Sequence, residues 1–332
     1  MRVTSIARRG AGNLTTMLSG RLASQIVLVV SAFIIPRVLG AENFGQYAAV
    51  MAVIAIAQTL SSFGLPMVEI RELPPLKKDG SDPALAVELG STIWVTRLIL
   101  SAIAGAAALV WLAASPELVG ASSILIPLGL LAFLRSAFEA SRSQLLPLGS
   151  VNLYVSLDLL RATLVLVVVV AAFRFAGLDG VFTWFAVVFV ILLPIALGRL
   201  RSALPLRPLS ARWHALRSFA GYGVAAFLGE LSLIAQQQFA VYIVAVRVNR
   251  LEAGVLALTI QLLTLLQGLF LTARAALMPI LAEINASGQT ARLRLWGSLM
   301  MRYAAAISCL ACVGWALLGN ELLARLRRLR PT

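Results

Sequence analysis

Charged and chemically reactive side chains are scarce in this sequence of 332 residues. Only 13% of the residues are charged, and the chain contains one histidine and two cysteines. The single histidine, His214, has no cluster of potential metal ligands around it, and no glycine-rich phosphate-binding loop of the Walker type is present. The sequence therefore predicts a protein that is not an enzyme and that uses no metal ion or other cofactor.

Long apolar stretches make up most of what remains. Hydrophobic residues account for 60% of the chain, and a helix needs about 20 mostly apolar residues to cross a bilayer. The stretches do not alternate with period two, as the strands of a membrane β-barrel do. We predict an all-α, polytopic membrane helical bundle of about nine spans. The predicted spans are Leu14–Pro36, Tyr47–Pro66, Ile93–Ala114, Ser122–Phe138, Tyr154–Phe173, Val181–Leu197, Phe219–Val246, Gly254–Leu277 and Leu299–Leu318.

Arginine and lysine are concentrated in alternate connections between these spans. Such residues are retained on the cytoplasmic side of a membrane. The segments 1–13, 67–92, 139–153, 198–218 and 279–298 hold 14 of them, whereas the four opposite connections hold 4. We therefore expect a multi-pass protein of the cytoplasmic membrane with a cytoplasmic N-terminus. The arginines of the C-terminal tail fall on the outer side in this topology, which suggests a chain that stops before a partner helix.

A short pattern recurs about 210 residues apart, each time ahead of a long apolar span. The two copies read Arg37-Val38, Glu42 and Gly45, and then Arg247-Val248, Glu252 and Gly254. Two parallel six-helix repeats are an arrangement found in transporters. We predict a first six-helix lobe at 1–198, a linker at 199–218 and an incomplete second lobe at 219–332.

The predicted linker contains five arginines and two prolines. Ser210 is placed to begin a short amphipathic helix, with Trp213 and Leu216 in the membrane interface and the arginines facing anionic phospholipid. An ordinary basic cytoplasmic loop explains the same composition. The net charge of +14 points to anionic lipid and not to nucleic acid as its partner.

Three segments carry a resemblance to a known family. They are residues 36–47 with Phe63-Gly64-Leu65 and Arg71 behind them, the stretch from Arg135 to Leu160, and Gly177-Leu178-Asp179-Gly180. These segments resemble bacterial polysaccharide-biosynthesis proteins of the Wzx, or oligosaccharide-flippase, type. That type belongs to the multidrug/oligosaccharidyl-lipid/polysaccharide exporter superfamily.

The resemblance implies a V-shaped pair of six-helix bundles around a central cavity in the bacterial inner membrane. It implies a transporter that flips a polyprenyl-pyrophosphate-linked oligosaccharide to the outer leaflet by alternating access. The product would enter O-antigen, capsule or exopolysaccharide synthesis, with the polymerase and glycosyltransferases of that pathway as partners. Members usually have twelve or more spans, so the resemblance also implies a C-terminally truncated chain.

Polar side chains at membrane depth are the candidates for a substrate cavity, because they are costly unless they face water or one another. Arg21 and Gln25 lie one turn apart in the first span, where a guanidinium suits a pyrophosphate. An arginine that extends to the cytoplasmic interface is an equal alternative.

The predicted seventh and eighth spans carry a second polar set. Glu230 and Gln237 are two turns apart and share a face, and Gln267 and Arg274 share a face of the next span. Glu230 is the candidate for coupling to a proton or sodium ion. A structural pair with Arg274 is the alternative.

Three further arginines form a candidate inner rim for an anionic headgroup: Arg135, Arg142 and Arg161. Their spacing from Glu139 and Asp158 also fits ordinary ion pairs within a helix.

Other functions fit parts of the sequence. A cation-coupled multidrug exporter of the same superfamily is the alternative within transport. A membrane glycosyltransferase or polymerase needs a substantial segment outside the membrane, and no connection exceeds about 25 residues on our reading of the spans. A non-transporting remnant or scaffold is the third alternative.

Overall fold

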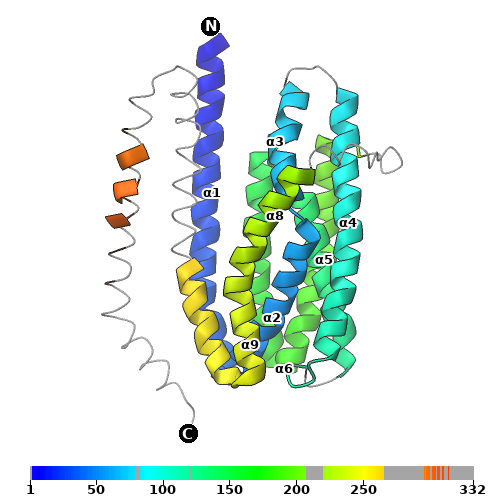
Figure 1. Cartoon of the computed structure of the whole chain (residues 1–332), viewed down its shortest axis with the longest axis vertical. Helices are drawn as coiled ribbons and strands as arrows, with labels where there is room; N and C mark the ends of the chain where they lie inside the picture. The colour runs from blue at the N-terminus through cyan, green and yellow to red at the C-terminus, as the bar shows by residue number, and fades with distance from the viewer. Residues whose placement is uncertain are drawn as a thin grey trace. The chain divides into compact units, whose positions relative to one another are not determined.

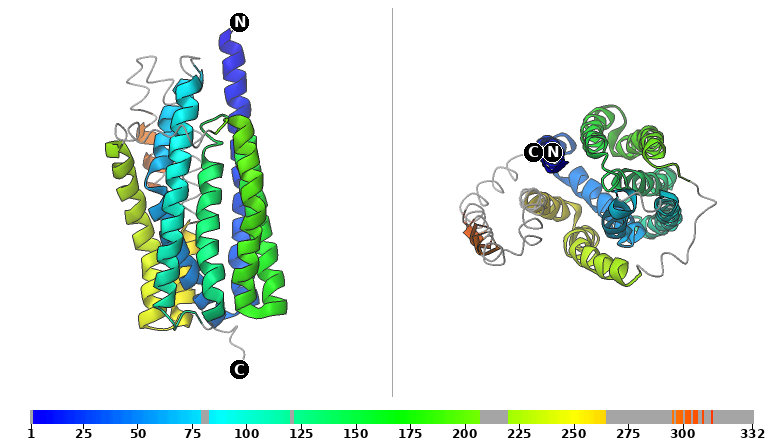
Figure 2. Two further views of the ribbon diagram at one scale, coloured as in Figure 1. Left: turned by 90° about the vertical axis from the view of Figure 1, so that its right-hand side faces the viewer. Right: turned by 90° about the horizontal axis from the view of Figure 1, so that it is seen from above.

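A computed structural model describes residues 2–78, 83–119, 122–206 and 220–264, with isolated positions after residue 294. The chain divides into two compact units, Met1–Ile260 and Gln261–Thr332, and nearly all of the described residues belong to the first. Every regular element in the described ranges is a helix. The helices run side by side along one direction (Figures 1 and 2). Their bounds are α1 (Arg2–Leu39), α2 (Ala41–Ser62), α3 (Leu65–Lys78), α4 (Pro83–Ala113), η1 (Ser122–Ile124), α5 (Leu125–Ser143), α6 (Val151–Ala203), α8 (Ala220–Ile234), η3 (Ala235–Phe239) and α9 (Ala240–Arg247); residues 250–264 are also helical.

Five of the described helical segments are long and apolar enough to cross a membrane. One of them, α6, consists of two span-length helices that meet at Gly177, where φ is 63° and ψ is −159°. Between η1 and α6 lies α5, which has 19 residues. The predicted all-α membrane bundle is confirmed. More than half of each of the last two predicted spans, Gly254–Leu277 and Leu299–Leu318, lies outside the described residues.

The centre of the first unit is α2. It packs against α1, α4, α5, α8, η3 and α9, and 12 of its 22 residues are buried. Of residues 221–247, only Gly223, Val241 and Ala245 are buried, so α8 and α9 are attached along one narrow strip.

The end of α2 differs from the predicted span. We expected helix as far as Pro66, but α2 ends at Ser62 because Phe63 and Gly64 have left-handed backbone angles, with φ of 44° and 70°. A new helix, α3, begins at Leu65. We expected this segment to be a connecting loop. After the break it is instead a helix, which packs on α4 and α8.

The seventh predicted span contains a π-helical turn, η3, between α8 and α9. A π-helical turn inserts an extra residue into the helical repeat. We expected Glu230 and Gln237 to share a face because the prediction assumed an uninterrupted α-helix. The π-helical turn η3 changes the angular relation between these two residues.

Candidate functional site

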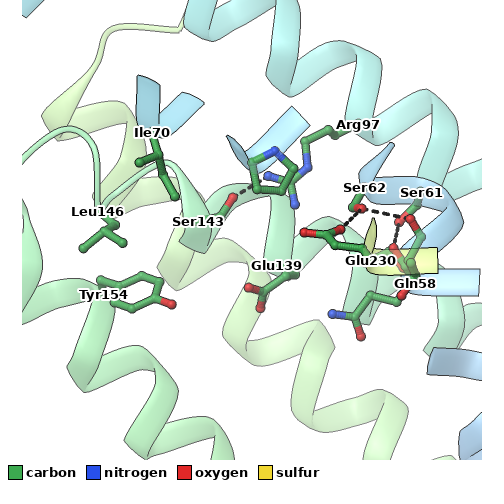
Figure 3. A pocket seen from close by; sticks show the side chains of 13 residues that line it. Gln58, Ser61, Ser62, Ile70, Arg97, Glu139, Ser143, Leu146, Tyr154 and Glu230 are labelled. Atoms are coloured by element: carbon green, nitrogen blue, oxygen red, sulfur yellow. Dashed lines mark hydrogen bonds between the residues drawn. The ribbon is translucent and has the colours of Figure 1, made fainter. Parts of the chain in front are cut away.

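A polar cavity of about 250 Å³ lies among α2, α3, α4, α5, α6 and α8. Figure 3 shows most of the side chains around it. They are chiefly hydroxyl, amide and charged groups, which membrane proteins place in hydrated or paired environments. The lining residues are Gln58, Thr59, Ser61, Ser62, Pro66, Ile70, Arg97, Ser136, Glu139, Ser143, Leu146, Tyr154 and Glu230.

The charge of Arg97 is neutralised by a buried carboxylate. The side chain of Glu69 is fully buried, and the guanidinium of Arg97 donates to both of its oxygens at 3.3 Å. Ser143 and Gln144 donate to the same carboxylate at 3.1 and 3.0 Å. Arg97 also donates to the Ser143 hydroxyl. Burial raises the pKa of Glu69, and Arg97 and the two donors oppose that rise.

This buried cluster is a scaffold for one wall of the cavity. It ties α3 to α4 and to the end of α5, and Gln144 adds a 3.0 Å hydrogen bond to the carbonyl oxygen of Gly90. Two polar atoms near it, Arg97 Nε and Ser136 Oγ, are buried without a hydrogen-bond partner. Buried polar atoms are normally satisfied by protein or water, so these two atoms indicate a place for water or ligand.

Glu230 enters the cavity from α8. Its Oε2 accepts a 3.1 Å hydrogen bond from the hydroxyl of Ser62, at the last turn of α2 (Figure 3). A helix C-terminus carries partial negative charge. No ion pair to Glu230 is present in the described part of the chain.

The other charged lining residue, Glu139, is paired. Arg142 donates to Glu139 at 2.8 Å, contacts Asp158 at 3.2 Å, and stacks over the ring of Tyr154 at 4.3 Å. Asp158 also pairs with Arg161 at 2.9 Å.

These contacts bear on the predicted inner rim. Arg142 and Arg161 lie in one network with two acids and carry little free positive charge. Arg135 is half-buried in α5 and does not line the cavity. The geometry favours the ion-pair interpretation of the first two residues.

The remaining predicted site residues divide into described and undescribed positions. Gln25 in α1 and Gln237 in η3 are half-buried, and neither lines the cavity. Arg21 lies in α1, but its side chain is outside the described part, as are Gln267 and Arg274. Among the predicted site residues whose side chains are described, only Glu230 lines this cavity.

Sequence reasoning missed Arg97, Glu69 and Tyr154. Arg97 lies four residues inside the predicted third span, so the rule that singled out Arg21 applies to it equally. Glu69 gave no such signal, because it was assigned to a connection. The predicted second span ends in the polar residues Gln58, Ser61 and Ser62. That signal was also overlooked.

The arrangement of helices is similar to that of a solved membrane transporter. The MATE multidrug transporter DinF-BH, solved with a bound ligand, matches with a TM-score of 0.66 and 18% identity over 97% of this chain and 75% of that one. A comparison with curated proteins finds no relative. The fold is therefore that of a multi-pass membrane transporter. The profile of the family described as "Polysaccharide biosynthesis protein" matches residues 11–285. The chain belongs to the polysaccharide biosynthesis protein family.

Proposed function

We propose that the chain moves a lipid-linked oligosaccharide from the inner to the outer leaflet of the bacterial inner membrane for surface polysaccharide synthesis. The polar cavity is the observation that carries this proposal. Its hydroxyl, amide and carboxylate groups both donate and accept hydrogen bonds, as sugar hydroxyls require. The family to which the chain belongs, by its description, serves polysaccharide synthesis.

The electrostatics of the cavity suit the sugar and not the phosphates of such a cargo. Arg97 and Arg142 are paired with acids, and Glu230 contributes a negative charge without a described cation beside it. A pyrophosphate would be repelled by that carboxylate. We assign the pyrophosphate instead to the polar set proposed from sequence, which is Arg21, Gln25, Gln237, Gln267 and Arg274.

Glu230 is the proposed coupling residue. A carboxylate that reaches a polar cavity next to a helix C-terminus favours a proton or a small cation. Binding of that cation neutralises the carboxylate and changes how α8 is held against α2 through Ser62. We propose anionic phospholipid as a ligand of the 199–218 segment, and a cytoplasmic N-terminus.

A deletion strain tests the proposal. Without the gene, lipid-linked glycan should accumulate on the inner leaflet and surface glycan should fall, and the intact gene should reverse both. Unaltered surface glycan after deletion would refute the flippase assignment.

A cation-coupled multidrug exporter is the second candidate, favoured by the fold shared with a MATE multidrug transporter and by the acidic cavity. Accumulation of cationic drugs separates the two. The flippase assignment predicts equal drug accumulation with and without the protein, and the exporter predicts lower accumulation with it.

A further inference from the structure

Two helices of the first unit meet backbone to backbone where each of them begins. A glycine is the fifth residue of each helix: Gly45 in α2, which starts at Ala41, and Gly254 in the helix that starts at Arg250. A Cβ added to Gly45 would overlap the carbonyl oxygen of Arg250, and one added to Gly254 would lie 2.9 Å from that of Ala41. The contact is reciprocal, so we call these four residues the glycine crossing.

The crossing joins the two copies of the repeated sequence pattern. Each glycine faces the first residue of the other helix, as an approximate two-fold relation between the two hairpins requires. Glycine inside a helix costs about 1 kcal/mol relative to alanine. Small residues are nevertheless favoured where membrane helices approach closely, and the close approach accounts for both glycines.

Arg250 adds a polar bridge across the crossing. A cation in the first turn of a helix is unfavourable because the helix dipole is positive there. Arg250 is instead oriented by contacts outside its own helix: it donates to Gln46 Oε1 at 3.0 Å and to the carbonyl oxygen of Glu117. Gln46 in turn donates to the carbonyl oxygen of Leu118 at 2.7 Å. The bridge therefore links three parts of the unit.

The crossing and the cavity lie at opposite ends of α2. Gln58, which lines the cavity, follows Gly45 by 13 residues, which is about 20 Å along a helix. In Figure 1 the crossing lies at the end where α2 begins and α9 ends, away from the N-terminus.

From this arrangement we infer that the glycine crossing closes the passage on the outer side of the membrane and separates each time cargo is released. This inference rests on the proposed function. Backbone contacts and hydrogen bonds at a membrane surface are replaced by water when they part. Because only Gly223, Val241 and Ala245 are buried among residues 221–247, which lead to the crossing, the separation exposes little apolar surface.

Reversible cross-linking tests the inference. In a protein with Cys309 and Cys312 replaced by serine, Gln46→Cys and Arg250→Cys are joined by a reducible bifunctional thiol reagent. Transport of lipid-linked oligosaccharide into reconstituted vesicles should stop and return after reduction. The control pair, Gly105→Cys with Phe133→Cys, joins α4 to α5 within the first lobe and should leave transport unchanged. Undiminished transport by the cross-linked outer pair would overturn the inference.

A second measurement does not need transport. The single cysteine of Gln46→Cys, at a site that is 7% exposed, should react several-fold faster with a membrane-impermeant thiol reagent when Gly254→Leu forces the crossing apart. Gly198→Leu, at a position with open space around it, should leave the rate unchanged. Equal rates of cysteine modification in the two variants would contradict the closure, even if no transport is detected. If the modification rates are as expected but transport is absent, the result would count against the proposed function alone.

Discussion

At the scale of single residues, the charged side chains around the cavity differ in their partners. Arg97 is held by Glu69, and Arg142 by Glu139 and Asp158. Glu230 has a hydroxyl partner instead. We therefore propose structural roles for Arg97 and Arg142 and a functional role for Glu230.

Replacement of Glu230 tests that functional role. Glu230→Gln keeps the shape of the side chain and its contact with Ser62 but removes the charge. The transport rate should therefore fall at least tenfold, which corresponds to a rise of about 1.4 kcal/mol or more in the activation free energy. The protein level should not change. The matched control is Asp179→Asn, an exposed acid in α6, which should transport normally. Full activity in Glu230→Gln would remove this residue from the mechanism.

The buried pair of Arg97 and Glu69 predicts a different pattern. Removing one partner leaves an uncompensated buried charge, which costs about 3–5 kcal/mol. Arg97→Leu alone should therefore lower the melting temperature of the purified protein strongly. The double variant Arg97→Leu, Glu69→Leu should recover most of that loss, since a buried pair replaced by apolar side chains is often neutral. A double variant no more stable than the single one would show that the pair is not an independent unit.

At the scale of elements, breaks in regular helix determine the geometry. The bend in α6 at Gly177 produces two spans from 53 continuous residues. The turn at Phe63 and Gly64 directs α3 back onto the bundle, and η3 interrupts the seventh span. The break at Gly177 lies between two predicted spans, Tyr154–Phe173 and Val181–Leu197, whereas the other two features do not follow from mean hydropathy.

Two glycines of α6 predict opposite effects of the same substitution. Gly177 has backbone angles that are nearly exclusive to glycine, so Gly177→Ala should destabilise the protein by about 1–3 kcal/mol. Gly198 is helical with open space around it, so Gly198→Ala should stabilise it by up to about 1 kcal/mol. Thermal unfolding of the two variants in one detergent measures both. A shift of the same sign in both would contradict this reading of the bend.

The sequence predicted most of the bundle, because apolar stretches of span length are sufficient to place membrane helices. The helices α1, α2, α4, α5, both parts of α6 and the segment from α8 to α9 occupy predicted spans. The cavity was less predictable. It depends on Glu69, which backbone angles at Phe63 and Gly64 bring to Arg97, and no periodicity encodes that approach. Glu230 was found because an acid inside an apolar span stands out by itself.

At the scale of the whole molecule, orientation is the property that links cavity and crossing to a direction of transport. We expect a cytoplasmic N-terminus, because the predicted connections on that side hold 14 basic residues. Single cysteines are placed at Arg9 and at Arg174 in the protein whose native cysteines are replaced by serine. In intact cells, the cysteine at position 9 should be protected from an impermeant thiol reagent, and the cysteine at position 174 should react with it. The reverse pattern would invert the topology and the proposed direction.

The central claim is that the polar cavity receives the sugar portion of a lipid-linked cargo during its movement across the membrane. The direct measurement is the rate at which a lipid-linked oligosaccharide becomes accessible to an enclosed glycosidase in vesicles containing the purified chain. The account predicts a rate well above that of protein-free vesicles and a rate near that background with Glu230→Gln. Equal rates for the intact chain and protein-free vesicles would contradict it.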